Sequence, residues 1–233
     1  MARRNLWGRL RDYYADAPDG WLTRSLGWLD WCVVDAGWVR FLWPNRHQVT
    51  PYYWRSAQPT PSALASAKAL GVRTIVDLRG ERRNGAYVTE RRRCRALGLE
   101  YVQCWTRSRA APTADDMARI TTVLDTVSYP IMVHCKSGAD RAGLMTACYL
   151  ILVENVAIAE AQAALHPRYG HFPFSATGVL DAYLAAYARA HKLNPNLEFR
   201  TWALTPGQAE AVQVSFTPRP FWGWFVDRVL RRE

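Results

Sequence analysis

The chain has 233 residues, of which 49% are hydrophobic and 21% are charged. This composition excludes a chain that is disordered throughout and supplies enough apolar side chains for one sizeable core with appendages. No stretch free of Asp, Glu, Lys and Arg approaches the roughly 20 residues of a membrane-spanning helix. The N-terminus has no uninterrupted apolar segment of the kind that a secretory signal needs. Five cysteines at irregular spacing form neither a disulfide framework nor a zinc pattern, so we expect a reduced, cytoplasmic protein.

The formal net charge is +10, carried by 27 Arg and three Lys against 20 acidic residues. A positive surplus favours acidic partners such as phosphate groups, anionic lipid or nucleic acid. Nucleic acid has only this net charge in its favour, because no recognition motif accompanies it. We therefore expect a phosphorylated substrate and peripheral contact with an anionic membrane, on its inner face, but no nucleic acid.

Residues 1–48 form a Trp-rich arm. Six of the eleven Trp lie in the first 43 residues, and a helix from Trp21 to Trp43 places four of them within one arc of about 100°. Apolar residues occupy the other sides of this helix as well, and a helix that is apolar all round is usually packed against protein. We expect the arm to dock on the core rather than to anchor the chain in a membrane.

Residues 49–192 alternate between strand and helix patterns. The expected strands cover Val72–Leu78, Leu99–Trp105 and Pro130–Val133, and the expected helices cover Pro61–Leu70, Gly85–Leu97, Thr113–Val127, Ala142–Val153, Ala157–Leu165 and Gly178–His191. Thr60 before the first of these helices is a cap signal, and Gly98 is a signal that ends the second. Strands separated by helices predict an α/β fold with a central, mostly parallel sheet flanked by helices.

Residues 193–233 form a C-terminal tail. Its last segment, PFWGWFVDRVLRRE, pairs aromatic and aliphatic residues against Asp and Arg at helical spacing. Such a basic amphipathic helix is a candidate for lying on a membrane surface.

One segment stands out for its chemistry: the strand Ile131–Val133, then HCKSGADRAG, then an apolar helix. A loop between a strand end and a helix start points successive backbone N–H groups into one concavity, where the helix dipole adds positive potential. We expect Lys136, Ser137, Gly138 and Ala139 to form this cradle, with the planar guanidinium of Arg141 matching two phosphate oxygens.

Cys135 lies at the floor of this cradle and is the candidate nucleophile. Helix N-termini and neighbouring cations bring thiol pKa values from about 8.5 to roughly 3.5–7.5. The resulting thiolate can attack a bound phosphorus atom and form a thiophosphate that water later hydrolyses. A lone Cys is more often a small buried hydrophobe, and we interpret the other four cysteines in that way: Cys32, Cys94, Cys104 and Cys148.

HCKSGADRAG resembles the His-Cys-x5-Arg signature of the cysteine-dependent protein tyrosine/dual-specificity phosphatase superfamily. Trp54–Pro59 (WRSAQP) and Thr74–Arg79 (TIVDLR) resemble upstream landmarks of its bacterial dual-specificity-like members. The resemblance makes residues 49–192 the phosphatase domain. It implies a parallel sheet wrapped by helices, a Cys nucleophile, a phosphate-binding Arg, and neither metal nor cofactor. It also implies that His134 holds the loop and favours the thiolate.

The sequence departs from the family pattern at two places. Many members carry Ser or Thr directly after the Arg, where the hydroxyl helps the sulfur to leave, but this chain has Ala142. Many also carry an Asp, the general acid, in the loop that here spans 106–112 and has no carboxylate. Asp140, next to Arg141, resembles the Asp-Arg pair of some bacterial and myotubularin-type relatives and is our candidate acid. Asp77 is an alternative that we interpret as a structural carboxylate.

Two neighbouring carboxylates, Asp115 and Asp116, are better explained as charges at a helix start.

The substrate is less defined. Lys136 resembles the Cys-Lys of lipid- and inositol-directed members, although the second lysine of those enzymes is Ala139 here. The segment 79–95 holds seven Arg against two Glu, and positive walls around a phosphate pocket draw polyanionic or membrane-bound substrates. We expect a phosphomonoester hydrolase acting on a membrane lipid or inositol head group. A phosphotyrosine or dual-specificity protein phosphatase, a non-catalytic phosphate-binding module and, more remotely, a rhodanese-like sulfurtransferase stay open.

Overall fold

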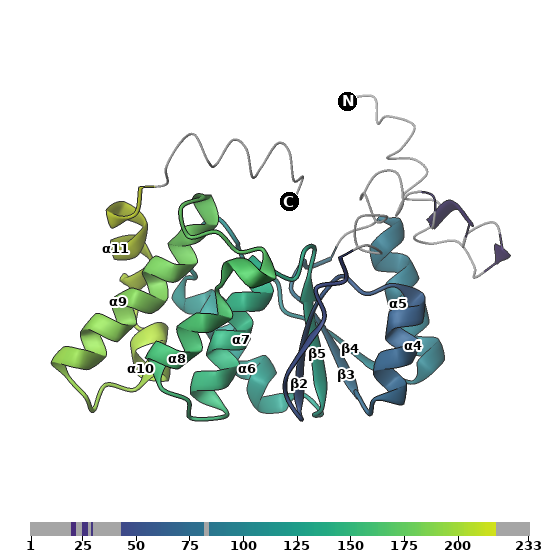
Figure 1. The fold of residues 1–233 in the computed structure, drawn as a ribbon, viewed down its shortest axis with the longest axis horizontal. Coiled ribbons are helices and arrows are strands. Elements are labelled where there is room, and N and C mark those ends of the chain that lie inside the picture. The colour runs from purple at the N-terminus through teal and green to yellow at the C-terminus, as the bar shows by residue number, and fades with distance from the viewer. Residues whose placement is uncertain (1–19, 22–24, 28, 30–42, 82–83, 218–233) are drawn as a thin grey trace.

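The structure is a computed structural model of the full chain, and it describes residues 20–21, 25–27, 29, 43–81 and 84–217 (Figure 1). Its strands are β1 (His47–Thr50), β2 (Tyr53–Ala57), β3 (Thr74–Asp77), β4 (Glu100–Gln103) and β5 (Ile131–Cys135). Its α-helices are α4 (Pro61–Ala69), α5 (Gly85–Leu97), α6 (Ala114–Thr126), α7 (Asp140–Leu152), α8 (Ile158–Ala161), α9 (Val179–Leu193), α10 (Phe199–Leu204) and α11 (Gln208–Ser215). Three short 3-10 helices are η1 (Gln162–Ala164), η2 (Pro167–Tyr169) and η3 (Ala176–Gly178).

The sheet has the strand order β1-β2-β5-β3-β4. Only β1 pairs antiparallel, with β2, whereas β2–β5, β5–β3 and β3–β4 are parallel. Helices α4 and α5 cover one face, and α6 to α11 lie on the other (Figure 1). The expected α/β class with a mostly parallel, helix-flanked sheet is confirmed. Because the parallel strands all run the same way, the loops that follow β3, β4 and β5 meet at one edge.

Short-range contacts begin and end the helices where the sequence predicts. The Thr60 hydroxyl accepts a hydrogen bond from Ala63 N at the start of α4, and Gly98 adopts a left-handed φ of +61° after α5. Asp116 completes a capping box with Thr113 at the start of α6, which confirms its interpretation as a helix-start charge. These elements need no long-range contact to begin or end.

Strands β3 and β4 and helix α8 are shorter than predicted, and three other differences affect the site or the core. Helix α7 begins at Asp140 rather than Ala142, so the Asp-Arg pair lies in its first turn. Strand β1 begins at His47, inside the segment that we expected to belong to the arm. The expected tail includes α10 and α11, and the buried Phe199 and Trp202 are part of the main core. The packed domain therefore extends past residue 192, because the rings of α10 and the small apolar side chains of α11 are buried in the same core as α9.

The described part of the arm before residue 43 lies against α5 at Gly27. Gly27 is buried, and a Cβ atom on Gly85 of α5 would collide with its backbone. Such close approach supports a docked segment. The rest of the expected Trp21–Trp43 helix, and the whole expected basic amphipathic helix near the C-terminus, lie outside the described residues. Within the described ranges, no helix has the length and apolar character needed to span a bilayer.

Candidate active site

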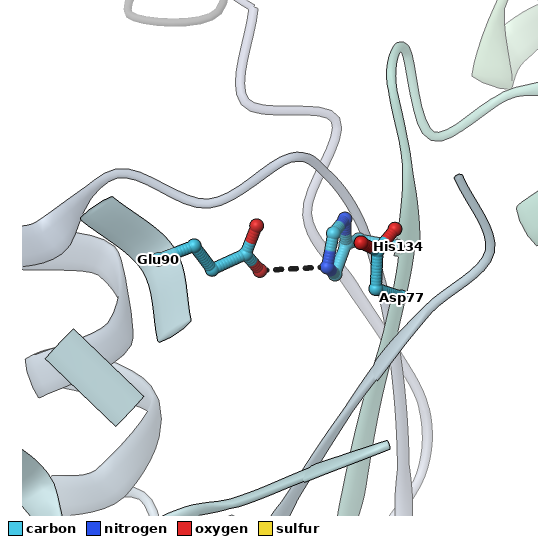
Figure 2. Close-up of side chains that lie close together, drawn as sticks. All are labelled: Asp77, Glu90 and His134. Carbon is cyan, nitrogen blue, oxygen red and sulfur yellow. Dashed lines mark ion pairs between the residues drawn. The ribbon is translucent and has the colours of Figure 1, made fainter. Parts of the chain in front are cut away.

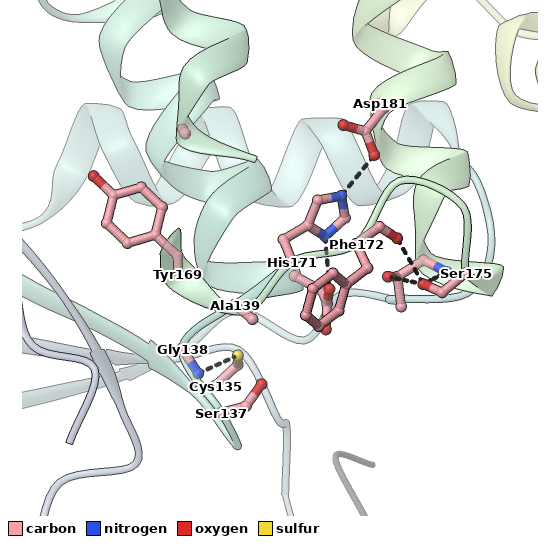
Figure 3. Close-up of polar contacts among 12 residues, drawn as sticks. Cys135, Ser137, Gly138, Ala139, Tyr169, His171, Phe172, Ser175 and Asp181 are labelled. Carbon is pink, nitrogen blue, oxygen red and sulfur yellow. Dashed lines mark hydrogen bonds and ion pairs between the residues drawn. The ribbon is translucent and has the colours of Figure 1, made fainter. Parts of the chain in front are cut away.

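The loop from Cys135 to Arg141 joins the middle strand of the sheet to α7 (Figure 3). Cys135 is 2% exposed, and Gly138 N donates to its Sγ at 3.2 Å. The N-cap of α7 is Ala139, whose methyl group cannot accept a hydrogen bond from the first-turn N–H groups. A helix start without a side-chain cap is the kind of place where proteins bind anions, and the phosphate cradle expected here stays a prediction.

Gly138 is the residue that lets the loop turn back on the sheet. Its φ is +74°, a conformation that side chains rarely adopt. A Cβ atom here would lie 2.5 Å from Ala57 N and 2.6 Å from Ser56 C. Only glycine fits, because the loop backbone lies directly against the end of β2.

Arg55 on β2 fixes the loop from behind. Its side chain is fully buried, and it donates from Nη2 to the carbonyl oxygens of Gly138 (2.8 Å) and Ala139 (3.0 Å) and from Nη1 to that of Ala164 (2.7 Å). Its guanidinium also stacks 3.8 Å from the ring centroid of Tyr169. Burial lowers the pKa of Arg55. In the sequence, Arg55 is only part of the segment Trp54–Pro59 that resembles the family. Its place in a short, otherwise buried strand is what indicates that it supports the loop.

Asn45 holds the same loop from the other side. Its Nδ2 donates to the carbonyl oxygens of Ser137 and Tyr169, each at 2.8 Å, and its Oδ1 lies 3.1 Å from His47 Nε2. This residue was missed, because its partners are distant along the chain and Asn after Pro is typical of a plain turn. It also places the end of the expected arm in the phosphatase site.

His134, which precedes the candidate nucleophile in the chain, pairs with Glu90 (Figure 2). Its Nε2 forms an ion pair with Glu90 Oε1 of α5 at 2.7 Å, and its Nδ1 lies 3.4 Å from the carbonyl oxygen of Cys135. Burial alone lowers the pKa of His134, but the charges of Glu90 and Asp77 outweigh burial and raise it. The pairing with Glu90 holds the ring against α5 and with it the end of β5, which is consistent with the role that the family resemblance implies.

Asp77 stands beside this pair as a structural carboxylate. Its Oδ1 accepts from Arg79 N and its Oδ2 from the Tyr101 hydroxyl, each at 2.7 Å. The ligand atoms of Asp77, Glu90 and His134 lie within 4.8 Å of one another. Since these atoms already bond to one another or to neighbouring donors, we interpret the cluster as a hydrogen-bonded support of the loop.

Asp140 and Arg141 occupy the first turn of α7 and are 2% and 3% exposed. Asp140 Oδ1 lies 2.7 Å from His171 Nδ1. Lys136 is half-buried in the loop, and its carbonyl oxygen accepts from Gln58 N at 3.3 Å. The structure thus places Cys135, the cradle residues, Asp140 and Arg141 in one strand–loop–helix unit. The other described cysteines lie elsewhere in the core, and burial raises the pKa of Cys94 and of Cys104 to about 12.

The middle strand of this mostly parallel sheet ends at Cys135, five residues follow it, and Arg141 lies in the first turn of α7. This arrangement defines the tyrosine/dual-specificity class of cysteine-dependent phosphatases. A family profile described as a DSP-PTPase phosphatase fused to NAD+ kinase matches residues 43–173, more than half of the chain. The chain therefore belongs to this DSP-PTPase family.

Individual relatives agree with this assignment. The dual specificity protein phosphatase TpbA of Pseudomonas aeruginosa strain PAO1 is 29% identical over 156 residues, which cover 64% of this chain and 62% of TpbA. TpbA of strain UCBPP-PA14 is 29% identical over 126 residues, which cover 52% of this chain and 51% of that protein. This chain thus spans less than two thirds of the length of the curated relatives that it matches. A crystal structure of P. aeruginosa TpbA has the same fold, with a TM-score of 0.50 and 22% identity over 69% of this chain and 90% of that one.

Proposed function

We propose that this protein hydrolyses phosphomonoesters through a cysteinyl-phosphate intermediate. The Cys135 thiolate attacks the phosphorus atom held in the loop, and the leaving oxygen departs with a proton that we assign to Asp140. Water then attacks the phosphorus, the S–P bond breaks, and the water proton returns to Asp140. Inorganic phosphate is released and the thiolate is restored.

The observation that carries this proposal is the contact between Gly138 N–H and Cys135 Sγ at 3.2 Å. A loop amide aimed at the sulfur stabilises a negative charge there, and the same concavity suits phosphate oxygens. Arg55 and Asn45 hold this arrangement in place, so little reorganisation is needed when an anion binds.

The test is release of phosphate from 4-nitrophenyl phosphate by the purified protein. Cys135→Ser should abolish turnover and retain binding of inorganic phosphate, whereas Cys94→Ser, on the opposite face of the sheet, should retain turnover per folded molecule. Turnover that survives Cys135→Ser would refute the nucleophile assignment. Phosphate binding by a wild-type protein without turnover would instead identify the non-catalytic module.

We propose a lipid or inositol head-group phosphate as the substrate. Arg107 lies in the loop after β4, where the neighbouring Thr106 N donates to the carbonyl oxygen of Leu78 at 3.4 Å. Arg168 stacks 4.5 Å from the Tyr169 ring, on the segment that Asn45 joins to the loop. Both side chains are exposed, and with Lys136 they bring positive charge to the edge of the sheet where the loop opens. These positive side chains stabilise a bound polyanionic head group more than a bound substrate with a single phosphate.

A phosphoprotein substrate is the second candidate, because the matched relatives are named dual specificity protein phosphatases. The two are separated by comparing kcat/KM for phosphatidylinositol phosphates in vesicles, soluble inositol phosphates and phosphotyrosine peptides, with Cys135→Ser as the blank. Arg168→Ala should reduce kcat/KM for the polyanionic substrates more than for 4-nitrophenyl phosphate. Equal reduction for both would contradict the proposed head-group preference.

A further inference from the structure

A row of three ionisable side chains leads from the phosphate loop into the helical layer (Figure 3). His171 Nδ1 lies 2.7 Å from Asp140 Oδ1, and His171 Nε2 lies 2.6 Å from Asp181 Oδ2. The three come from separate elements: the start of α7, the loop between η2 and η3, and the first turn of α9. His171 is fully buried and Asp140 nearly so, whereas 32% of the Asp181 side chain is exposed.

These contacts determine the charge of the ring. An ionised carboxylate only accepts hydrogen bonds, so both contacts are favourable when both ring nitrogens carry hydrogen. A neutral ring would turn a lone pair toward one of the two carboxylates. Burial lowers the pKa of His171, but the hydrogen bonds and charges of Asp140 and Asp181 outweigh burial and raise it to about 9. The ring is therefore an imidazolium at neutral pH.

The segment that carries His171 is held by hydrogen bonds and close contacts of its own turn. Gly170 before it has a φ of +79°, and the turn after it is closed by Ser175, whose N and Oγ both donate to the Phe172 carbonyl oxygen at 3.1 and 2.8 Å. The backbone of the same turn lies directly against the start of α9, so that a Cβ atom on Gly178 would collide with the Pro173 carbonyl. The ring is thus held between two helices by backbone, and its position does not depend on a loop closing.

We propose that His171, anchored by Asp181, is the positioning residue for Asp140 in the phosphatase reaction. This inference rests on the proposed function and assigns a role to a residue that no sequence motif indicated. The ring fixes the Asp140 carboxylate next to Arg141, and with it the first turn of α7 that receives the phosphate. When the leaving oxygen takes a proton from Asp140, the Nδ1 proton of the imidazolium passes to Asp140 Oδ1, 2.7 Å away, and it returns by the same route when water attacks. His171 thus acts through Asp140 and does not touch the reacting atoms.

The first test is the pH profile of kcat/KM for 4-nitrophenyl phosphate. A histidine whose pKa is raised from about 6.5 to about 9 keeps its bridging role below the lower value and loses it as pH rises through the higher one. Asp181→Asn removes one of the two anions and should move this alkaline fall to lower pH by about one unit or more. Asp125→Asn, a surface aspartate paired with Arg200, removes the same charge elsewhere and should leave the profile unchanged.

The second test is a double-mutant cycle. His171→Gln should lower kcat about 10- to 100-fold with little change in KM, and Asp140→Asn should lower it at least as much. In the Asp140→Asn background neither His171→Gln nor Asp181→Asn should cost further activity, because the positioned group is gone. A loss that persists in that background, or an alkaline fall that stays in place in Asp181→Asn, would overturn the proposal.

A readout without turnover separates this inference from the proposed function. In the Cys135→Ser protein, NMR titration of the His171 ring should show the raised pKa and its decrease in Asp181→Asn, and His171→Gln should weaken binding of inorganic phosphate several-fold. If the proposed function is wrong, the protein will show no Cys135-dependent turnover, while the His171 titration and the phosphate-binding results stay as described. A normal His171 titration or unchanged phosphate affinity would refute the positioning role itself.

Discussion

Replacing Gly138 by alanine tests whether the close approach of the phosphate loop to β2 is needed for function. A left-handed φ costs a non-glycine residue about 1–2 kcal/mol. The added methyl would lie 2.5 Å from Ala57 N, so the loop or the strand must move by about 0.9 Å to reach ordinary contact at 3.4 Å. Overpacking of this kind costs about 1–3 kcal/mol more. A displacement near 1 Å in a catalytic site can also cost about 100-fold in rate.

Gly98→Ala is the matched control for this substitution. Gly98 also has a positive φ, of +61°, but a Cβ atom there meets nothing within 4 Å. The control should lose about 1–2 kcal/mol of stability and keep its activity. Urea unfolding and 4-nitrophenyl phosphate turnover of both variants measure the two effects separately. If Gly138→Ala turned over substrate as fast as Gly98→Ala, the contact between loop and strand would not be what shapes the site.

Three further substitutions test two residues that support the phosphate loop and one position at which the chain departs from the family pattern. Arg55→Lys offers one nitrogen to three carbonyl oxygens, so it should lower the unfolding free energy by about 2 kcal/mol or more and weaken phosphate binding, measured by calorimetry. Glu90→Gln removes one of the two anions that raise the pKa of His134. The stability that this pair adds is complete below about pH 6.5 and declines as pH rises, so the wild-type advantage in unfolding free energy should shrink as pH rises above that value. Ala142→Ser restores a hydroxyl after the arginine and should speed breakdown of the phospho-enzyme, which rapid-quench burst kinetics would detect as a smaller burst and a faster steady state.

The sequence was most informative where the deciding contacts are short-range. Thr60 and Thr113 cap helices through residues three positions away, and Gly98 ends α5 through its own φ. The phosphate loop belongs to the same class, because Cys135, Gly138 and Arg141 lie within one turn between a strand and a helix. For such features, residue type and spacing define the local geometry.

The supports of the loop could not be predicted, because they join distant segments. Arg55 reaches a carbonyl 83 positions away, and Asn45 reaches one 92 positions away. Asp140 and His171 are 31 positions apart. No periodicity encodes such pairs. The charge of Arg55 would have been a sign only if its strand, Tyr53–Ala57, had been predicted to be buried, since buried charge requires a partner that the fold must supply.

Asn45 also explains why the loop presents an N–H group to Cys135. Each peptide unit carries its N–H and C=O in opposite directions. Asn45 Nδ2 holds the carbonyl oxygen of Ser137 at 2.8 Å, and the N–H of the same peptide unit, on Gly138, donates to Cys135 Sγ at 3.2 Å. Arg55 holds the next two carbonyl oxygens, those of Gly138 and Ala139. These two buried side chains orient the peptide dipoles of the loop before an anion arrives, and orientation fixed in advance is the form of electrostatic stabilisation that loses least to reorganisation.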